Sequence, residues 1–356
     1  MSITTKEVEV FTPKHTLSDF IESQPFLNQV IKRGYKSLKP IQDEIIPYIS
    51  DGNDVVGLAN TGTGKTAAFL IPLVNKILAN RSQQVLILVP TRELALQINE
   101  ELKSITHSLG IHSVVCVGGM SIGLQIRDLR RFNNFIIGTP GRTLDLMKRK
   151  VLKLETVKNV VLDEADRMLD MGFINDIRLV MKSVNPQRQT LCFSATMSAE
   201  INKIINEFLN DPITISVKTR DIACNIEQDI IRLQGRIKID VLHDLLKNSE
   251  FRKVLVFGRT KHGVEDLFQK LEKRGIKAGS IHGNKSHNGR QRSLKNFKYG
   301  FINVLVATDV AARGLDIDNI SHVINYELPE NYDDYIHRIG RTGRGDKKGK
   351  ALTFVN

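Results

Sequence analysis

An acidic cluster follows an apolar run in "VVLDEADRML", residues 160–169. Asp163 comes first after the run, where a carboxylate can hold Mg²⁺, and Glu164 comes next, where it can activate a water molecule as a general base. Asp166 stands two residues further, in an emerging helix. Acids also favour the first turn of any helix, so the cluster alone fits a solvated helix start equally well. Its chemistry depends on what the rest of the chain supplies.

A glycine-rich segment, "ANTGTGKT" at residues 59–66, lies upstream, after the apolar run "DVVGL" and before a helix-period segment. Small residues let backbone N–H groups surround phosphate oxygens, and the N-terminus of the following helix adds positive potential. Lys65 would reach the β- and γ-phosphates, and the Thr66 hydroxyl would hold Mg²⁺. Ala59 stands where the strict pattern has Gly. The loop that would cradle the phosphates consists of Thr61, Gly62, Thr63 and Gly64.

Three arginines recur at a spacing of three in "HRIGRTGR", residues 337–344. On a helix, Arg338, Arg341 and Arg344 would share a face, although the glycines among them predict a short helix that soon ends. An arginine that reaches a γ-phosphate across a cleft would explain the cluster. A solvated basic surface is the alternative.

The elements that must position these residues are short apolar runs, each followed by a helical pattern. Most runs are continuously apolar, which is typical of parallel strands covered by helices on both faces. Gly110 is expected to end the helix in "ELALQINEELKSITHSLG". The runs of the first block are "DVVGLA", "VLILVP", "SVVCVGG", "FIIGTP", "NVVLDEAD", "TLCFSAT" and "ITISV". Those of the second block are "QDIIRL", "KVLVFGR", "AGSIHG", "NVLVATD", "SHVINYELP" and "ALTFV".

The two blocks predict an α/β protein with two doubly wound parallel-sheet domains in tandem. A polar, aperiodic stretch separates the blocks, so we expect domains over residues 1–217 and 228–356 and a linker over 218–227. The segments "PTRE", "GG" and "TPGR" all follow strands, at the carboxyl edge where α/β sheets bind ligands. Their arginines can meet phosphate, and none of these segments carries an aromatic residue on which a base could stack.

The composition adds a basic imbalance to this picture. The net charge is +12; residues 1–217 carry 25 Lys and Arg against 22 Asp and Glu, and residues 218–356 carry 26 against 17. Excess positive charge favours a polyanionic partner, with solubility as the plainer explanation. Cys116 and Cys192 lie in apolar runs and are expected in the core. The N-terminal segment shows no secretory pattern and no run reaches membrane length, so a cytoplasmic protein is expected.

Taken together, these motifs resemble those of DEAD-box ATP-dependent RNA helicases, and most closely the bacterial RhlE-like branch. The likeness extends from about Phe20 to the last strand and follows the family's motif order. It implies two RecA-like domains, the core of helicase superfamily 2, with ATP and Mg²⁺ as cofactors. It also implies that Gln42 reads adenine with Phe20 upstream, that Asp316 meets the ribose, and that Arg341 and Arg344 are the arginine fingers.

The same resemblance implies RNA contacts and coupling residues. Coupling of ATP state to RNA would use Asp166, Ser194, Thr196 and His337. RNA contacts, to the backbone with little reading of base sequence, would come from Pro90, Thr91, Arg92, Gly119, Thr139, Pro140, Gly141, Arg142, Arg290, Thr308 and Arg313. Departures from the family pattern occur at Leu38, Lys39, Gly258 and His287. Family members usually continue after "ALTFVN", which leaves open whether the second domain is truncated at its end.

The implied activity is RNA-stimulated ATP hydrolysis coupled to local, non-processive duplex unwinding or remodelling of RNA–protein complexes. ATP and RNA would each bind the closed arrangement of the two domains better, and together drive closure. Two alternatives stay open: a clamp that uses ATP to lock onto RNA, and a DNA translocase. Every hydrolytic position is retained, which counts against an inert clamp.

Overall fold

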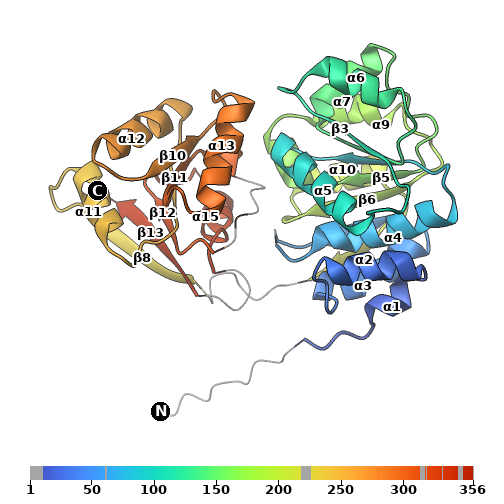
Figure 1. The fold of residues 1–356 in the computed structure, drawn as a ribbon, viewed down its shortest axis with the longest axis horizontal. Coiled ribbons are helices and arrows are strands. Elements are labelled where there is room, and N and C mark those ends of the chain that lie inside the picture. Colours follow the sequence, from blue (N-terminus) through green and yellow to red (C-terminus); the bar gives the residue numbers. More distant parts are fainter. Residues whose placement is uncertain are drawn as a thin grey trace. The chain divides into compact units, whose positions relative to one another are not determined.

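The computed structural model describes residues 11–60, 62–217, 226–312, 317, 319–330, 332–343 and 348–355. By its contacts the chain divides into two compact units, Met1–Lys218 and Thr219–Asn356 (Figure 1). Several residues singled out from the sequence lie outside the described residues: Thr61, linker residues 218–225, Arg313, Asp316 and Arg344.

The first unit is built on a seven-stranded sheet of order β3-β4-β2-β5-β6-β1-β7, in which every pairing is parallel. Most of its strands are buried along their whole length, as continuous apolar runs require in a doubly covered sheet. The strands are β1 Val55–Leu58, β2 Val85–Leu88, β3 Ser113–Cys116, β4 Phe135–Gly138, β5 Asn159–Leu162, β6 Gln189–Ser194 and β7 Ile213–Ser216.

Helices cover both faces of this sheet and enclose two apolar cores. The first core lies under α1 to α5 and the second under α7 to α10 (Figure 1). Cys116 and Cys192 are buried in the second core, as expected, and burial raises the pKa of each thiol to about 12. The helices are α1 Leu17–Phe20, α2 Gln24–Lys32, α3 Pro40–Ser50, α4 Lys65–Ala79, α5 Arg92–Ile105, α6 Ile122–Leu129, α7 Pro140–Lys148, α8 Ala165–Asp170, α9 Ile174–Met181 and α10 Ala199–Phe208.

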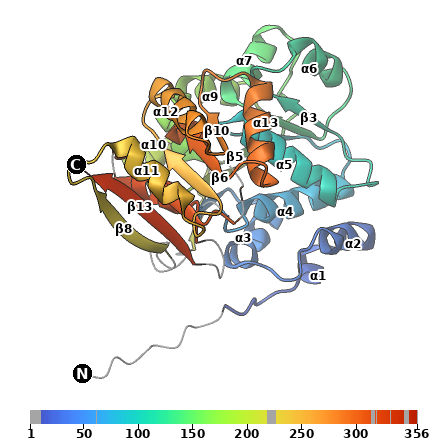
Figure 2. The same ribbon diagram turned by 60° about the vertical axis from the view of Figure 1, so that its left-hand side comes forward.

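The second unit repeats the architecture with a six-stranded parallel sheet of order β10-β11-β9-β12-β13-β8. The long strands β13 and β8 pair along seven residues, and they lie side by side in Figure 2. The strands are β8 Ile226–Arg232, β9 Val254–Phe257, β10 Ala278–Ile281, β11 Val304–Ala307, β12 His322–Asn325 and β13 Gly349–Val355.

The two faces of the second sheet carry different helices. α11 and α12 pack on one face, whereas α13 and α15 lie on the other (Figure 1). The helices are α11 Lys238–Lys247, α12 Lys261–Lys273, α13 His287–Lys298, α14 Asp309–Ala312 and α15 Tyr332–Ile339. Within the described ranges, no helix has the length and apolar character needed to cross a membrane.

The prediction of two doubly wound parallel sheets is confirmed, and one predicted helix end is wrong. Helix α5 ends at Ile105, five residues before Gly110. Thr106 caps the helix, because its backbone N–H at 2.9 Å and its hydroxyl at 2.7 Å both donate to the carbonyl oxygen of Leu102. Ser108 then takes a positive φ of 65°, which breaks the helix before Gly110 is reached.

Candidate functional site

Three loops of the first unit are brought together because β6 lies between β1 and β5 in the sheet. The parallel register pairs Leu58 with Ser194 and Leu162 with Cys192. Since the strands run in the same direction, their carboxyl ends share one edge. The phosphate-loop segment, the acidic cluster and the 194–196 segment therefore stand side by side.

The phosphate-loop segment leads directly into the N-terminus of α4. Gly64 caps the helix with φ 95°, and Lys65 is the first helical residue, only 7% exposed. Gly64 also has little space, because a Cβ there would come within 2.5 Å of the Gln42 amide nitrogen. Glycine is thus required for both its backbone angle and its close approach. The helix directs its free N–H groups toward the loop, as phosphate binding needs.

Side chains at the start of α3 donate hydrogen bonds to this loop. The Gln42 amide Nε2 donates to the carbonyl oxygen of Gly64 at 3.0 Å, while its Oε1 accepts from the backbone N–H of Lys39 at 2.9 Å. The Lys39 ammonium reaches the carbonyl oxygen of Gly62 at 3.3 Å. The sequence marked Lys39 only as a departure from a family pattern; the structure puts it in contact with the loop.

Asp163 is a buried carboxylate, 3% exposed, at the end of β5. Burial raises its pKa to about 6, and Glu164 adds to the rise while Lys65 opposes it. Its Oδ1 accepts the backbone N–H of Glu164 at 3.0 Å. Holding this carboxylate ionised costs free energy unless a cation stands nearby.

Glu164 has an unusual backbone and a partner that the sequence analysis missed. Its φ of 53° and ψ of 51° lie in the left-handed region, which is uncommon for a residue with a side chain. Its Oε2 accepts from the Arg167 guanidinium at 3.0 Å, and the two side chains are 10% and 5% exposed. The spacing of three in a helix was a signal that could have revealed this pair.

Asp166 binds the segment that follows β6. Its Oδ2 accepts the backbone N–H groups of Ala195 at 2.9 Å and Thr196 at 3.2 Å. Ser194 donates its hydroxyl to the carbonyl oxygen of Thr196 at 2.8 Å, which closes the turn. The three acids of the cluster thus have three different environments. The contact expected between Asp166 and "SAT" is present.

A second set of predicted residues lies at the same edge of the sheet, after β2, β3 and β4. Thr91 caps α5, its hydroxyl accepting from the N–H of Leu94 at 3.3 Å, and Thr139 occupies the N-cap of α7. A Cβ on Gly119 would overlap the Arg92 guanidinium, so these two segments touch. Arg142 donates to the carbonyl oxygen of Met120 at 3.4 Å. Two helix N-termini and two arginines therefore face a common region.

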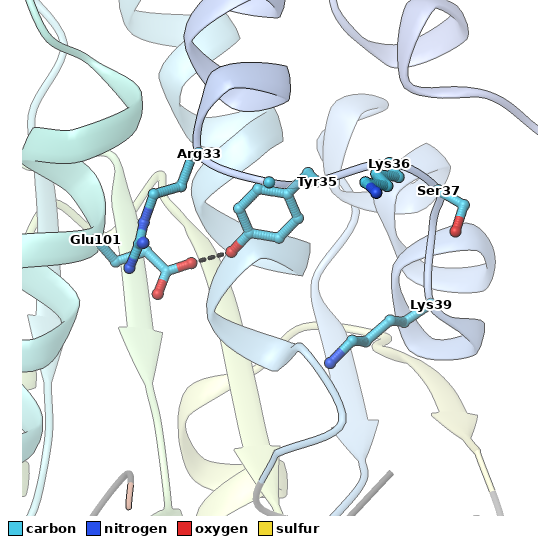
Figure 3. Close-up of a pocket in the computed structure, with 7 residues that line it drawn as sticks. Arg33, Tyr35, Lys36, Ser37, Lys39 and Glu101 are labelled. Carbon is cyan, nitrogen blue, oxygen red and sulfur yellow. Dashed lines mark hydrogen bonds between the residues drawn. The ribbon is translucent and has the colours of Figure 1, made fainter. Parts of the chain in front are cut away.

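An open pocket of about 410 Å³ lies beside the start of α3 (Figure 3). Tyr35 crosses it and donates its hydroxyl to Glu101 of α5. Lys39 belongs both to this pocket and to the contacts of the phosphate loop. The pocket is lined by Arg33, Gly34, Tyr35, Lys36, Ser37, Lys39 and Glu101.

Comparison with known proteins identifies the family. A DEAD/DEAH box helicase model matches residues 39–204, and a helicase conserved C-terminal domain model matches residues 237–346. The DEAD-box ATP-dependent RNA helicase CshA of Bacillus subtilis is 45% identical over 96% of this chain and 69% of its own length. The chain belongs to the DEAD-box helicase family.

Other DEAD-box relatives agree in sequence and in fold. The ATP-dependent RNA helicase CshA of Listeria monocytogenes is 45% identical over 95% of this chain, which spans 65% of that protein's length. Dbp5 of S. cerevisiae, solved with RNA and ADP BeF3, matches with TM-score 0.85 at 29% identity, over 96% of this chain and 89% of its own. Mss116p, solved with single-stranded RNA and AMP-PNP, matches with TM-score 0.86 at 30% identity, over 99% and 76%.

His15 joins helix α3 of this DEAD-box chain to the upstream aromatic, Phe20. The His15 ring lies 5.0 Å from the Phe20 ring, and its Nδ1 is 2.8 Å from a carboxylate oxygen of Asp43, the neighbour of Gln42. The carbonyl oxygen of Phe20 accepts from the Asn75 amide of α4. These contacts fix the segment around Phe20 to both α3 and α4.

In the second unit, the DEAD-box arginines separate into different environments. Arg338 is 1% exposed and forms a two-pronged ion pair with Asp309, at 2.6 Å and 2.7 Å. Its remaining nitrogen donates to the carbonyl oxygen of Glu327 at 2.6 Å and to Asn325 at 3.2 Å. Arg338 therefore meets its anion inside its own unit, which the spacing of the three arginines did not predict.

Arg341 follows α15 and is 5% exposed, with its Nε donating to the carbonyl oxygen of His337 at 3.3 Å. Thr308 follows β11, and its backbone N–H donates to the carbonyl oxygen of Ile281 at 3.3 Å. Arg290 lies in the first turn of α13. Thr308 and Arg290 thus lie at the carboxyl edge of the second sheet, where Thr91 and Thr139 lie in the first.

Proposed function

We propose that this chain is an ATP-dependent RNA helicase that couples RNA-stimulated ATP hydrolysis to local, non-processive unwinding or remodelling of RNA–protein complexes. The observation that carries the proposal is the shared edge of β1, β5 and β6, where Lys65, buried Asp163 and the Asp166 contact with Thr196 stand together. These are the parts that phosphoryl transfer needs: a phosphate cradle, a metal ligand and a connection to another segment.

The ATP part of the proposal rests on the loop at the start of α4. Gly62, Thr63, Gly64 and Lys65 would bind the phosphates, and Gln42 would read adenine. The pocket that shares Lys39 with this loop offers room for the rest of the nucleotide. To bind adenine, Gln42 would turn its amide from the Gly64 carbonyl to the base.

The residues present fit Mg²⁺, because buried Asp163 lacks a full counter-charge and the Thr66 hydroxyl and a carboxylate are the hard oxygen donors that this ion prefers. Bound there, Mg²⁺ would neutralise charge on the β- and γ-phosphates. Glu164 would hold the attacking water and take its proton. Arg167 would fix the direction of that carboxylate through its 3.0 Å bond. Asp316, Arg341 and Arg344 would complete the site by meeting the ribose and the γ-phosphate.

RNA would bind through its phosphates and sugars. The N-termini of α5 and α7, with Arg92 and Arg142, present N–H groups and positive charge without an aromatic platform. Pro90, Gly119, Pro140 and Gly141 would allow the close approach of the backbone. In the second unit Arg290, Thr308 and Arg313 would make the corresponding contacts. We propose that ATP and RNA together drive closure, with Asp166, Ser194, Thr196 and His337 transmitting the ATP state.

A strand-displacement assay tests this function against its nearest alternative, an ATP-dependent RNA clamp. A short RNA duplex with a single-stranded overhang is incubated with the chain, with and without ATP. The proposal expects strand release that requires ATP. ATP-dependent binding without release would favour the clamp. Stimulation of ATP hydrolysis by DNA as strong as that by RNA would favour a DNA translocase.

Two finer assignments stay predictions. The bacterial RhlE-like branch is proposed from motif resemblance, while the relatives described above carry the name CshA. A cytoplasmic location is proposed from the absence of a secretory pattern in the sequence.

A further inference from the structure

Helix α13 has an exposed ridge that carries only positive charge. Its sequence, "HNGRQRSLKNFK", contains no Asp or Glu. Arg292, Lys295 and Lys298 follow one another at a spacing of three and are all exposed. This spacing places them along one side of the helix over about 9 Å. Within the described part of the chain, none of the three forms an ion pair. The ridge is therefore free to meet an anion.

Two exposed aromatic side chains stand where this ridge ends. The helix is closed by Gly300 at φ 78°, with the N–H of Phe301 donating to the carbonyl oxygen of Asn296 at 2.8 Å and that of Gly300 to Phe297 at 3.4 Å. In this type of helix end, the residue after the glycine usually packs on an apolar side chain three positions before the cap. That position holds polar Asn296, so Phe301 has no such partner.

The exposure of the pair is large. Phe301 is 69% exposed and Tyr299 is 66% exposed, whereas Phe297, one turn earlier, is fully buried. The end of the helix is thus anchored in the core by Phe297, and the folded state gains little from the other two rings. Two exposed aromatic rings at one turn, beside the cations of the ridge, are available to a binding partner.

The surroundings of the pair are basic as well. The Lys253 ammonium reaches the last carbonyl of the helix, that of Lys298, at 3.4 Å. Lys277 is exposed, and its carbonyl oxygen accepts the N–H of Asn303 at 2.9 Å, which brings the start of β10 next to the same turn. A partner that contacts both rings would therefore meet positive charge on more than one side.

We propose that Arg292, Lys295, Lys298, Tyr299 and Phe301, here called the α13 track, form an additional binding surface for single-stranded RNA. The cations would follow the phosphate backbone, and the two rings would stack on bases without reading their sequence. Arg290, already expected to contact RNA, lies at the other end of the same helix. The track would extend a strand from that contact along the helix. This inference rests on the proposed RNA-dependent function.

RNA fits the track better than a protein partner does. A protein-docking surface requires a contiguous apolar patch, and here two rings are flanked by cations of one sign. Positive charge that follows the backbone, combined with aromatic faces for stacking, is the pattern of surfaces that bind single strands. The track also supplies the stacking platform that "PTRE", "GG" and "TPGR" lack.

The test compares three variants of the full chain in binding two single-stranded RNAs, a short one and one longer by about ten nucleotides. The variants are Tyr299→Ala/Phe301→Ala, the charge variant Arg292→Gln/Lys295→Gln/Lys298→Gln, and a matched control, Lys247→Gln/Lys270→Gln/Lys273→Gln. The control removes the same charge from α11 and α12, on the opposite face of the same sheet. Urea unfolding of each variant checks that the fold is retained.

We expect the aromatic variant to bind the longer RNA on the order of tenfold more weakly, with ATP hydrolysis on saturating short RNA unchanged. The charge variant should lose about two from the slope of log affinity against log salt on the longer strand, because three phosphate contacts disappear. The control variant should lose less than half as much affinity for the longer RNA as the aromatic variant does. Its salt slope should also fall by less than half as much as that of the charge variant.

Equal affinity of the aromatic variant and the unmodified chain for the longer RNA would overturn the inference. So would a loss in the control as large as in the charge variant. Normal RNA-stimulated ATP hydrolysis on the short strand in those cases would show that the proposed function stands and only the track fails. If the unmodified chain neither binds RNA nor responds to it, the proposed function and this inference both fail.

Discussion

The two units each bury a charged side chain near the carboxyl edge of their sheet, but they treat that charge in opposite ways. Asp163 in the first unit is 3% exposed, and burial raises its pKa to about 6. Arg338 in the second unit is 1% exposed, yet Asp309 pairs with it in two-pronged geometry and two further acceptors complete its bonding. The charge of Arg338 is completed by the protein, and we propose that the charge of Asp163 is completed by a bound cation.

This difference separates a binding site from its scaffold. A buried charge that costs stability persists where a cation or substrate compensates for it. A buried charge with saturated bonding fixes the elements that carry it, and here Arg338 connects α15 to α14 and β12. The comparison predicts that substitution of Asp163 raises the free energy of unfolding and that substitution of Arg338 lowers it. Substitutions at other charged residues of the two sheet edges test it further.

The largest effect is expected at Arg341, which tests whether a well-buried arginine of the second unit can act on substrate. Arg341→Ala should lower ATP turnover on the order of a thousandfold, because a finger arginine stabilises charge in phosphoryl transfer. ATP binding, measured with a fluorescent nucleotide analogue, should change far less. Turnover that survives the substitution would place Arg341 with Arg338 in the scaffold.

Arg338→Gln should destabilise the chain by about 3–5 kcal/mol, because the partly buried Asp309 carboxylate loses its two-pronged partner and the buried acceptors around Arg338 lose their donor. Chemical unfolding followed by circular dichroism measures the loss. The double variant Arg338→Met/Asp309→Leu serves as the control and should be less destabilised than the single variant. A single variant of normal stability would remove the distinction between scaffold and site.

Asp163→Asn should change stability in the opposite direction, by on the order of 3 kcal/mol at pH 7. Because the pKa of Asp163 is raised from 3.8 to about 6 on folding, the folded state holds the proton more tightly, and ionisation lowers stability as pH rises through this window. The gain from the substitution should therefore be absent at pH 3.5 and complete above pH 6.5.

Urea unfolding of both chains across this range, without nucleotide, provides the measurement. ATP hydrolysis by the substituted chain should be abolished at the same time. A gain that is already complete at pH 3.5 would show that Asp163 is not the titrating group.

The smallest effect is expected at Asp166, whose carboxylate is partly buried and accepts backbone hydrogen bonds. Asp166→Ala should cost about 1–2 kcal/mol, since the N–H groups of Ala195 and Thr196 lose their acceptor. It should also reduce the stimulation of ATP hydrolysis by RNA more than basal hydrolysis. Asp166→Asn retains an acceptor oxygen and should recover part of the stability. Equal losses of basal and stimulated rates would indicate a structural role alone.

The predictable part of the molecule is the part with local signals. Continuous apolar runs indicated the parallel strands, and the loops after them placed Lys65, Asp163 and Thr139 at one edge, because all parallel strands end on the same side. Helix ends were less predictable: α5 ended at Ile105, and Ser108 took a positive φ before Gly110 was reached.

Long-range partners were not predictable, because no local pattern marks them. Asp309 and Arg338 are 29 residues apart, and neither sequence context indicates that they pair or that Arg338 is buried. The contact of Lys39 with Gly62 likewise depends on how α3 packs beside the phosphate loop. The Glu164–Arg167 ion pair could have been predicted, because oppositely charged residues three apart at a helix start lie close together.

The central claim is that the acidic cluster and the phosphate loop form a hydrolytic site controlled by RNA. Phosphate release from ATP, measured with and without single-stranded RNA at fixed Mg²⁺ and salt, tests it in the unmodified chain and in Glu164→Gln. RNA should raise the rate of the unmodified chain, and the substitution should lower the stimulated rate by about a hundredfold or more while ATP and RNA still bind. A rate that ignores RNA, or that survives Glu164→Gln, would contradict the account.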